Sequence, residues 1–333
     1  MKNVLKASVS AAALLLAAPV LAQSSSNVTQ TGSANSATIA QTGSSASTVT
    51  QTGNNASANV EQDGAGNNSV VTQSATATAI VDQTGNNNSS TIDQIAAGNR
   101  ATVAQTGAGN SSDIDQNTAN NFARVAQTGI GNSSTVQQSA TAGIGYYANA
   151  YGGFQVGYAN ISQIGDELAS SVSQTGASNF ADITQVGEDN GSVVEQSGNG
   201  TYAVVDQSGS GNGSMVRQSG YVVNFSGSAG VRQSGTNNTS ELNQSGSWSG
   251  WGSDYTVNNT ATITQSNDGN NSLANQGGVD NTLRVLQSGD GNDSLINQSG
   301  TLNDAFVTQT SNGNTSNLTQ TGTNSIATVN QGS

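Results

Sequence analysis

Glutamine recurs at every eleventh residue through most of the chain, and this fixed period constrains the fold more than any other feature. Two uninterrupted runs show it: Gln94, Gln105, Gln116, Gln127 and Gln138, then Gln163, Gln174, Gln185, Gln196 and Gln207. A short fixed period is typical of repeat proteins, in which one small unit stacks on the next. The sequence therefore predicts a regular array of stacked units.

Each unit has the same pattern when its positions are counted from its glutamine. Position −6 is asparagine, −4 is small, −2 is Val or Ile, and glycine usually follows at +2, as in Asn99, Ala101, Val103, Gln105 and Gly107. These positions are even offsets on the N-terminal side, so in an extended strand they share one face, and charged residues avoid that face. We expect an interior lined by glutamine ladders and by asparagine ladders, the latter including Asn99, Asn110, Asn121 and Asn132.

The residue at −4 alternates between serine and alanine, as in Ser90, Ala101, Ser112 and Ala123. The true repeat is therefore 22 residues long and has two unequal halves. We expect one turn of a flat β-solenoid per repeat, with two strands per turn, Ser-type strands on one wall and Ala-type strands on the other. The fold class is thus all-β and cross-β in its stacking, with about 26 strands in about 13 turns. Glycine in every unit, and the lack of a helical apolar period, disfavour helices.

Three longer spacings interrupt the period, between Gln138 and Gln163, Gln218 and Gln233, and Gln244 and Gln265. Across each of them position −4 passes directly from serine to alanine, so no strand is missing. The sequence therefore predicts enlarged corners at about 139–156, 219–226 and 245–258, all on the same edge of the solenoid.

Aromatic residues gather around two of these corners. They are Tyr146, Tyr147, Tyr151, Phe154 and Tyr158 near the first corner, and Trp248 and Trp251 in the third. Exposed aromatic rings can contact sugars, surfaces or neighbouring fibrils. The simpler alternative is that these rings only cover that edge of the solenoid.

The first 22 residues form a separate segment. Lys2 and Lys6 precede an apolar run over 11–18, and Val20 and Ala22 are small residues where a signal peptidase cuts. We expect residues 1–22 to be a secretory signal peptide and residues 23–333 to be a single repeat domain. No stretch is long and apolar enough to predict membrane insertion.

Composition narrows the function classes. Beyond the predicted signal peptide the chain has five arginines against twenty acidic residues, and it has neither histidine nor cysteine anywhere. An acidic chain of this kind disfavours binding to nucleic acid or to anionic membranes. The commonest general base, the thiol nucleophile and the best zinc ligands are absent. We therefore expect no enzymatic activity, no cofactor and no metal site, and we interpret carboxylates such as Asp113 and Asp115 as solvated charges that discourage lateral aggregation.

The repeat resembles a known family. Gln105-x-Gly107-x-Gly109-Asn110, followed by Ser112 and Gln116, is similar to the curlin repeat, and the residues from Gln127 to Gln138 match in the same way. Curlins build curli, the extracellular functional amyloid of bacterial biofilms, and this chain has unusually many repeats. The resemblance implies a secreted, self-associating fibre subunit at the cell surface, with an outer-membrane secretion system and a nucleator subunit as partners.

The strands at the two ends of the sequence lack an obvious cap, so the repeat pattern itself also predicts end-to-end stacking into a fibre. The alternative is a monomeric secreted β-solenoid, either an adhesin or an ice-binding protein. An ice-binding wall would need a regular Thr-x-Thr array, which only isolated units supply, for example Thr48 with Thr50.

Overall fold

The structure, a computed structural model, describes residues 12–13, 23–139, 157–220, 227–246 and 258–332, and these contain strands and corners but no helix. Each compact part of the chain is a parallel β-solenoid with about 22 residues per turn, and the described strands make up about 12 turns in all, close to the 13 turns expected. The all-β class and the solenoid predicted from the sequence are therefore confirmed. The chain divides into two compact units, residues 1–139 and residues 140–333.

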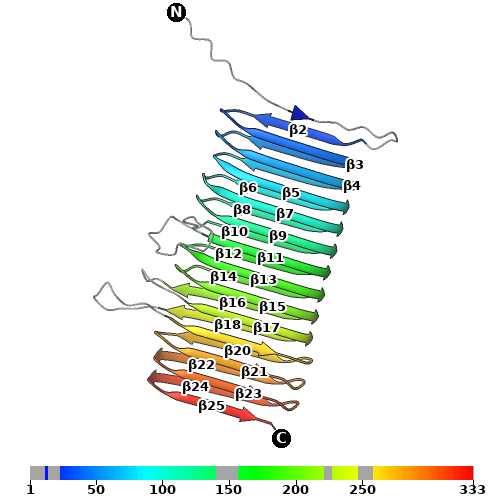
Figure 1. Ribbon diagram of the computed structural model, residues 1–333. Coiled ribbons are helices and arrows are strands. Elements are labelled where there is room, and N and C mark those ends of the chain that lie inside the picture. Colours follow the sequence, from blue (N-terminus) through cyan, green and yellow to red (C-terminus); the bar gives the residue numbers. More distant parts are fainter. Residues whose placement is uncertain (1–11, 14–22, 140–156, 221–226, 247–257, 333) are drawn as a thin grey trace, which may run out of the picture. The chain divides into compact units, whose positions relative to one another are not determined.

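The first unit consists of stacked parallel strands (Figure 1). They are β1 (Ala12–Ala13), β2 (Ser25–Gln30), β3 (Ser36–Gln51), β4 (Ser57–Gln73), β5 (Ala77–Asn86), β6 (Ser89–Gln94), β7 (Asn99–Ala108), β8 (Ser111–Gln116), β9 (Phe122–Ile130) and β10 (Ser133–Gln138). The long strands β3 and β4 each pass through a corner and contribute to both walls. Alternate strands pair, so that β7 pairs with β9 and β8 with β10, which puts Gln105 in register with Gln127 and Gln116 with Gln138.

The second unit continues with the same arrangement. Its strands are β11 (Gly157–Asp166), β12 (Ala169–Gln174), β13 (Asn179–Glu188), β14 (Gly191–Gln196), β15 (Tyr202–Ser210), β16 (Gly213–Gly220), β17 (Ser228–Thr236), β18 (Thr239–Gly246), β19 (Thr260–Gln265), β20 (Asn271–Gly277), β21 (Thr282–Gln287), β22 (Asp293–Thr301), β23 (Asp304–Gln309), β24 (Thr315–Thr323) and β25 (Ile326–Gln331). Ala-type strands pair with Ala-type strands, as Ala181 does with Ala203, and Ser-type with Ser-type, as Ser192 does with Ser214.

The parallel register continues across the two longer spacings of the second unit. Gln218 is in register with Gln244, and Gln233 is in register with Gln265, although their separations along the chain exceed 22 residues. Strands β16 and β18 run two residues into the corners expected at 219–226 and 245–258. The greater part of all three predicted corners lies outside the described residues.

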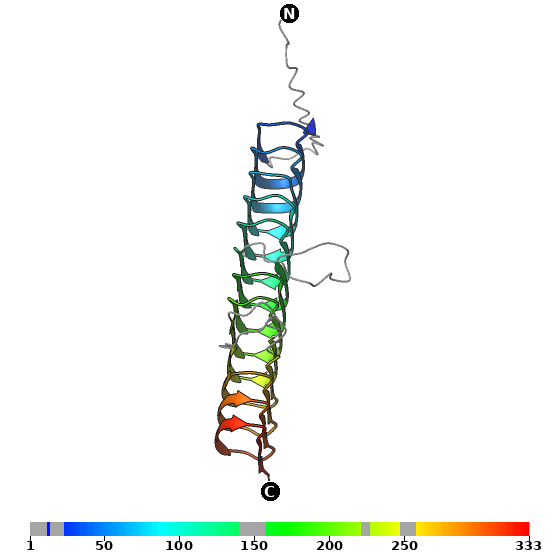
Figure 2. The same ribbon diagram turned by 90° about the vertical axis from the view of Figure 1, so that its left-hand side faces the viewer.

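Burial alternates along the strands, as the even and odd offsets predict. In β8, Ser112, Ile114 and Gln116 are buried, whereas Asp113 is exposed and Asp115 is half-buried. Figure 2 shows the two walls of the turns edge-on. The side chains that fill the thin space between the walls are aliphatic at −2 and small at −4, so close packing of short side chains replaces a conventional thick core.

Ala-type strands from β5 to β17 are longer than the six residues expected, whereas the Ala-type strands β19, β21, β23 and β25 have six. Strand β7 has ten residues, whereas β8 on the other wall has six. The difference arises at the corner that follows, where Gly107 has a φ of 122° and the chain keeps pairing with the next turn. A residue without a side chain is required for that left-handed backbone. Strand pairing therefore extends into the corners that follow these Ala-type strands, and near the C-terminus it extends into the corners that follow the Ser-type strands β22 and β24.

Candidate functional site

The stacked interior glutamines are the most extensive polar feature of the structure. Within the stack, Nε2 of one glutamine donates to Oε1 of the glutamine one turn later, at 2.8 Å for Gln94 to Gln116, Gln116 to Gln138 and Gln105 to Gln127. The second unit repeats these bonds from Gln163 to Gln185, Gln174 to Gln196, Gln185 to Gln207 and Gln196 to Gln218. All ten glutamines named from the sequence are buried.

The same amides also join the two walls. Nε2 of Gln116 donates to the backbone oxygen of Arg100 at 3.2 Å, and Nε2 of Gln105 donates to the backbone oxygen of Ser89 at 2.9 Å. In both cases the acceptor lies at the start of the preceding strand, on the opposite wall. Gln105 and Gln116 thus satisfy both of their N–H groups inside the solenoid, one along the stack and one across it.

The asparagines at −6 form a second set of ladders at the corners. The backbone N–H of Asn132 donates to Oδ1 of Asn110 at 3.1 Å, and that of Asn121 donates to Oδ1 of Asn99 at 2.9 Å. Nδ2 of Asn110 also donates to the corner oxygen of Gly129, one turn on, at 3.0 Å. The four asparagines named from the sequence are all buried, and each one fastens its corner to the corner of a neighbouring turn.

The two kinds of ladder have opposite directions. Within the glutamine ladders each side chain donates toward the C-terminal turn, as from Gln94 to Gln116, whereas within the asparagine ladders each residue donates toward the N-terminal turn, as from Asn110 to Asn88. The additional bond from Asn110 to Gly129 goes to backbone and lies outside the ladder. A turn therefore presents glutamine donors and asparagine acceptors on its C-terminal side. On its N-terminal side it presents glutamine acceptors and asparagine donors.

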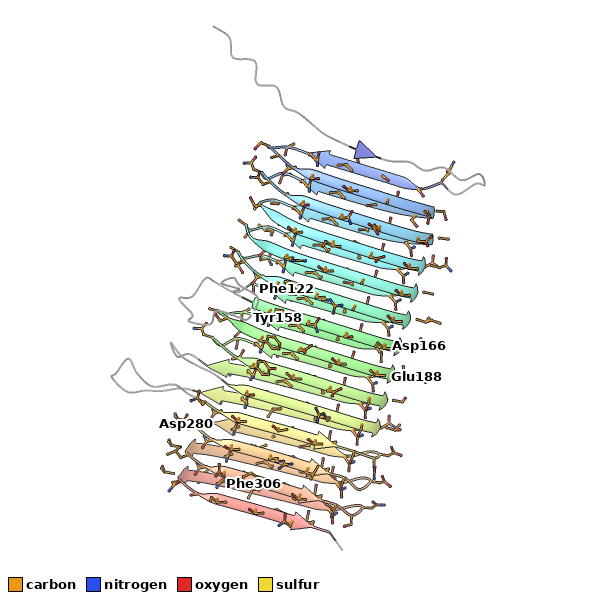
Figure 3. All side chains as sticks on the ribbon, in the orientation of Figure 1. Phe122, Tyr158, Asp166, Glu188, Asp280 and Phe306 are labelled. Carbon is orange, nitrogen blue, oxygen red and sulfur yellow. The ribbon has the colours of Figure 1, made fainter. Side chains whose placement is uncertain are left out.

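An aromatic column on the outer face of the second unit differs from the sequence expectation. Tyr158 does not lie in a corner but on strand β11, where its ring stacks on Phe180, which in turn stacks on Tyr202 (Figure 3 labels Tyr158). The ring centroids are 4.8 and 4.6 Å apart, with interplanar angles of 2° and 8°. Sequence reasoning missed Phe180 and Tyr202, although the 22-residue spacing of the three residues could have found them.

This stacking limits what the column can bind. The facing sides of Tyr158, Phe180 and Tyr202 cover one another, so these ring faces are closed to a ligand. Binding of a sugar on a ring face is therefore disfavoured here, and the column stabilises the contact between successive turns. The other predicted contact aromatics, Tyr146, Tyr147, Tyr151, Phe154, Trp248 and Trp251, lie outside the described residues.

Ion pairs join successive turns on the outer faces. Nε of Arg217 lies 3.0 Å from Oε2 of Glu195, and its Nη1 lies 2.8 Å from Oε1 of Glu241. On the other wall, Arg232 lies 3.3 Å from Asp206. These side chains are largely exposed, so each pair contributes little to stability, and its main effect is to favour one register over its neighbours.

The first unit carries an acidic cluster instead. Asp93 is in register with Asp115 on the adjacent strand, and Asp113 lies two residues from Asp115 on the same face. Burial, followed by the negative charges of Asp115 and Asp113, raises the pKa of Asp93. Burial, followed by Asp115, also raises the pKa of Asp113. Among the described residues, no group of three or more acidic side chains is arranged to hold a metal ion.

We expect the stability of the first unit to increase as the pH falls. Because the pKa values of Asp93 and Asp113 are raised in the folded state, the folded chain retains protons that the unfolded chain has lost. The free energy of unfolding should therefore rise as the pH falls through the raised pKa values, and level off below the pKa of an unfolded aspartate. Denaturant titrations of unassembled chain across this pH range measure the effect.

The matched variant for that titration is Asp93→Asn with Asp113→Asn. It removes both raised pKa values and leaves Asp115 with no neighbouring charge in the cluster. The pH dependence should become shallower, and stability at neutral pH should rise. An unchanged profile would contradict a role for this cluster.

Comparison with known families identifies the repeat. Residues 77–107, 158–187, 187–220 and 278–310 match the family model of the curlin associated repeat. The resemblance inferred from the motif is thereby confirmed, and the chain carries curlin repeats in both units. No curated protein matches the chain. No helix of the described residues has the length and apolar character needed to cross a membrane.

Proposed function

We propose that this protein is the structural subunit of an extracellular curli-type amyloid fibre. After removal of residues 1–22, copies stack end to end through their glutamine and asparagine ladders and contribute to biofilm matrix, adhesion and surface attachment. The fibre lies at the bacterial cell surface, and its other partners are a nucleator subunit and a curli-type outer-membrane secretion system. The curlin repeats support a structural and non-enzymatic role. The observation that carries the proposal is the complementarity of the two end turns.

The last turn offers hydrogen-bond donors. Strands β24 and β25 pair with β22 and β23, and the described residues contain no strand on their other edges. Gln320 and Gln331 accept from the preceding glutamines of their ladders and donate only to backbone oxygens of their own turn. Ile326 on β25 is 75% exposed. This end therefore has an open strand edge with one unused amide N–H group on each ladder glutamine.

The first turn offers the matching acceptors. Gln30 on β2 donates to Gln51 at 2.6 Å, and among the described contacts its Oε1 accepts no hydrogen bond. Strand β2 is Ser-type, and among the described strands it pairs with β3 alone. Placing the last turn of one copy against the first turn of the next continues both ladders in their own direction. Placing two like ends together would bring donors against donors, so the ladders favour polar, head-to-tail stacking.

Glutamate in place of the terminal ladder glutamines should block growth. Gln320→Glu with Gln331→Glu replaces the donors on the last turn with carboxylates that would meet the acceptors of the next copy. We expect fibre elongation at neutral pH to slow by about tenfold or more, because an unpaired charge at a dry interface is strongly unfavourable. Elongation of residues 23–333 from preformed seeds, followed by thioflavin fluorescence and electron microscopy, measures the rate.

The control adds the same charges to the same strands without entering the ladders. Asn317→Glu and Asn330→Glu change exposed residues of β24 and β25. This variant should elongate much faster than the ladder variant. Equal elongation rates for the two variants would reject the stacking proposal. A wild-type chain that stays monomeric, with no strand-spacing reflection of about 4.8 Å along a fibre axis, would also reject it and would favour the monomeric alternative.

A further inference from the structure

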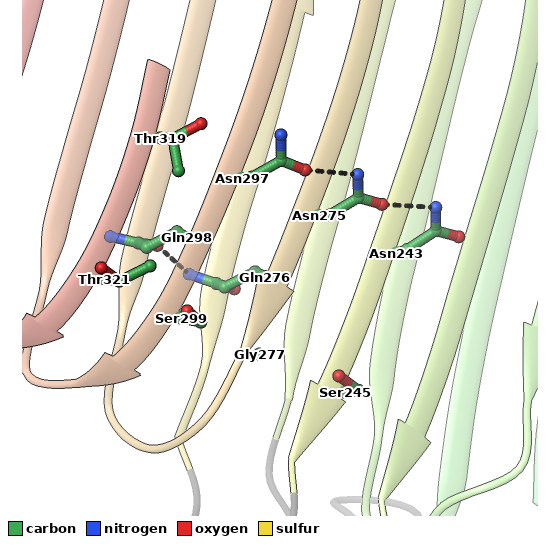
Figure 4. Close-up of a pocket in the computed structure, with 10 residues that line it drawn as sticks. All are labelled: Asn243, Ser245, Asn275, Gln276, Gly277, Asn297, Gln298, Ser299, Thr319 and Thr321. Carbon is green, nitrogen blue, oxygen red and sulfur yellow. Dashed lines mark hydrogen bonds between the residues drawn. The ribbon is translucent and has the colours of Figure 1, made fainter.

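An open groove of about 340 Å³ crosses the outer face of the Ser-type wall in the second unit (Figure 4). It spans four successive strands of that wall, β18, β20, β22 and β24. Its lining residues are Asn243, Ser245, Asn275, Gln276, Gly277, Asn297, Gln298, Ser299, Thr319 and Thr321. The groove therefore follows the stacking direction and runs across the strands.

The groove lies where the sequence departs from its own repeat at two positions, the residue before the glutamine and the residue after it. Three successive turns carry asparagine one residue before the glutamine, and their side chains form a short outer ladder. Nδ2 of Asn243 donates to Asn275 at 2.9 Å, and Nδ2 of Asn275 donates to Asn297 at 2.9 Å. One residue after the glutamine, this turn has Gly277, which has no side chain. The turns on either side have Ser245 and Ser299 at that position. An amide ladder thus borders a gap that a missing side chain has opened.

The lining is polar and uncharged. None of the ten residues is ionisable, in a chain whose formal net charge is −13. Asn275 uses one N–H group and one carbonyl lone pair along the ladder, and Asn297 only accepts there. Asn243 donates its second N–H group to Glu241 at 3.1 Å, so the N–H groups available to a ligand are those of Asn275 and Asn297. The hydroxyl groups of Ser299, Thr319 and Thr321 add further donors and acceptors.

A second groove on the same wall shows the contrast. It has a volume of about 300 Å³ and spans β12, β14 and β16. Glu195 and Arg217 lie in it and form an ion pair with each other at 3.0 Å. Equivalent positions on the wall can therefore carry charge, and the groove at Gly277 is distinct in carrying none.

We propose that the groove at Gly277 binds an uncharged polysaccharide chain that lies along the stack. Amides and hydroxyl groups without charges match the alternating donors and acceptors of a neutral polyhydroxyl polymer. An extended peptide is a poorer match, because its residues repeat at about 3.3 Å whereas the ladder repeats at about 4.8 Å, and peptides join sheets at strand edges. The groove has no aromatic ring against which a sugar could stack, so a single site binds weakly. In a fibre the groove repeats once per copy, and this repetition supplies avidity. The avidity argument therefore rests on the proposed function.

Filling the gap tests this proposal without breaking the ladder. The backbone of Gly277 is not in the left-handed region, and an added Cβ would come no closer than 3.3 Å to any neighbour, the Oγ of Ser245. Gly277→Leu therefore blocks the groove and should leave the fold intact. The matched control is Gly213→Leu, on β16 of the same wall, where an added Cβ meets nothing within 4 Å.

The experiment measures co-sedimentation of fluorescent hydroxyethyl cellulose and dextran with washed fibres of each variant. Alginate serves as the anionic comparator, and a neutral extended peptide serves as the peptide comparator. Fibre formation is checked first by electron microscopy. A chain that forms no fibres is immobilised as soluble protein, and its polysaccharide binding is measured in the same way. A failure of fibre assembly is thereby distinguished from a failure of polysaccharide binding. We expect at least one neutral polymer to bind wild type and Gly213→Leu equally, and Gly277→Leu roughly tenfold more weakly, because the leucine occupies the contact volume. Equal binding to the groove-filled variant, or binding of only alginate or the peptide, would overturn the proposal.

Discussion

Replacing Gln116 by methionine is expected to be among the most damaging single changes in the first unit. Methionine is close to glutamine in length and volume, so the variant removes the amide and leaves little cavity. Three hydrogen bonds disappear, to Gln94, Gln138 and the backbone oxygen of Arg100. These groups are left without their partner in a dry interior, which should lower the free energy of unfolding by about 3 to 6 kcal/mol.

A neighbouring glutamine provides the control for this prediction. Gln137 lies on β10, one residue before Gln138, and its side chain is exposed on the outer face. Gln137→Met should change the free energy of unfolding by less than about 0.5 kcal/mol, as is usual for surface positions. Denaturant unfolding of unassembled chain gives the stability, and hydrogen exchange of the β6, β8 and β10 amides locates the loss. Similar effects at the two positions would show that the ladder bonds contribute little.

The sequence was sufficient to predict the interior because the interior is where the period is strictest. The glutamine at each eleventh residue, the aliphatic residue two before it and the Ser/Ala alternation determine which face is buried and which strands share a wall. Ser192 pairs with Ser214 and Ala181 with Ala203 for that reason. A slip of one residue would move every interior side chain to the outside, so the pattern leaves a single register.

The outer face was less predictable because its contacts depend on which side chains happen to lie one turn apart. The stacking of Tyr158 on Phe180 and the Arg217 ion pairs each require a partner one turn away that the eleven-residue pattern does not reveal. The opposite directions of the glutamine and asparagine ladders follow from rotamers and cannot be read from residue types. The groove depends on two local departures, the asparagines one residue before the glutamine and Gly277 one residue after it, which a search for regularity passes over.

The interior also contains a feature that the period does not explain. The hydroxyl groups of Ser90, Ser112 and Ser134 are buried and have no hydrogen-bond partner within the described structure, and the same holds for Ser170, Ser192 and Ser214. Serine side chains are too short to reach one another at a turn spacing of about 4.8 Å unless their rotamers converge. Ser294 and Ser272 do converge, at 2.9 Å. The glutamine and asparagine amides are long enough to bridge the spacing routinely, which explains why they, and not serine, form the ladders.

Replacing Gly107 by alanine is expected to match or exceed the effect of losing a ladder glutamine. The φ of Gly107 is 122°, a conformation that residues with a side chain rarely adopt. A Cβ atom added there would lie 2.0 Å from the backbone oxygen of Gly129 on the next turn. Backbone strain and the clash together should cost about 3 to 6 kcal/mol. The clash is with backbone, so it can be relieved only by separating the corners of two turns, and that also stretches the bond from Asn110 to the same oxygen.

Gly191 provides the matched glycine. It begins β14, its backbone is not in the left-handed region, and an added Cβ would meet nothing within 4 Å. Gly191→Ala should therefore leave stability unchanged or raise it by about 0.4 to 1 kcal/mol, because alanine reduces the conformational freedom of the unfolded chain. Denaturant midpoints of the unassembled variants, with hydrogen exchange at β7 and β9, distinguish the two glycines. If Gly107→Ala proved as stable as Gly191→Ala, the corners could not be stacked as closely as the structure places them. The direct contact between corner glycines would then not be what sets the spacing between turns.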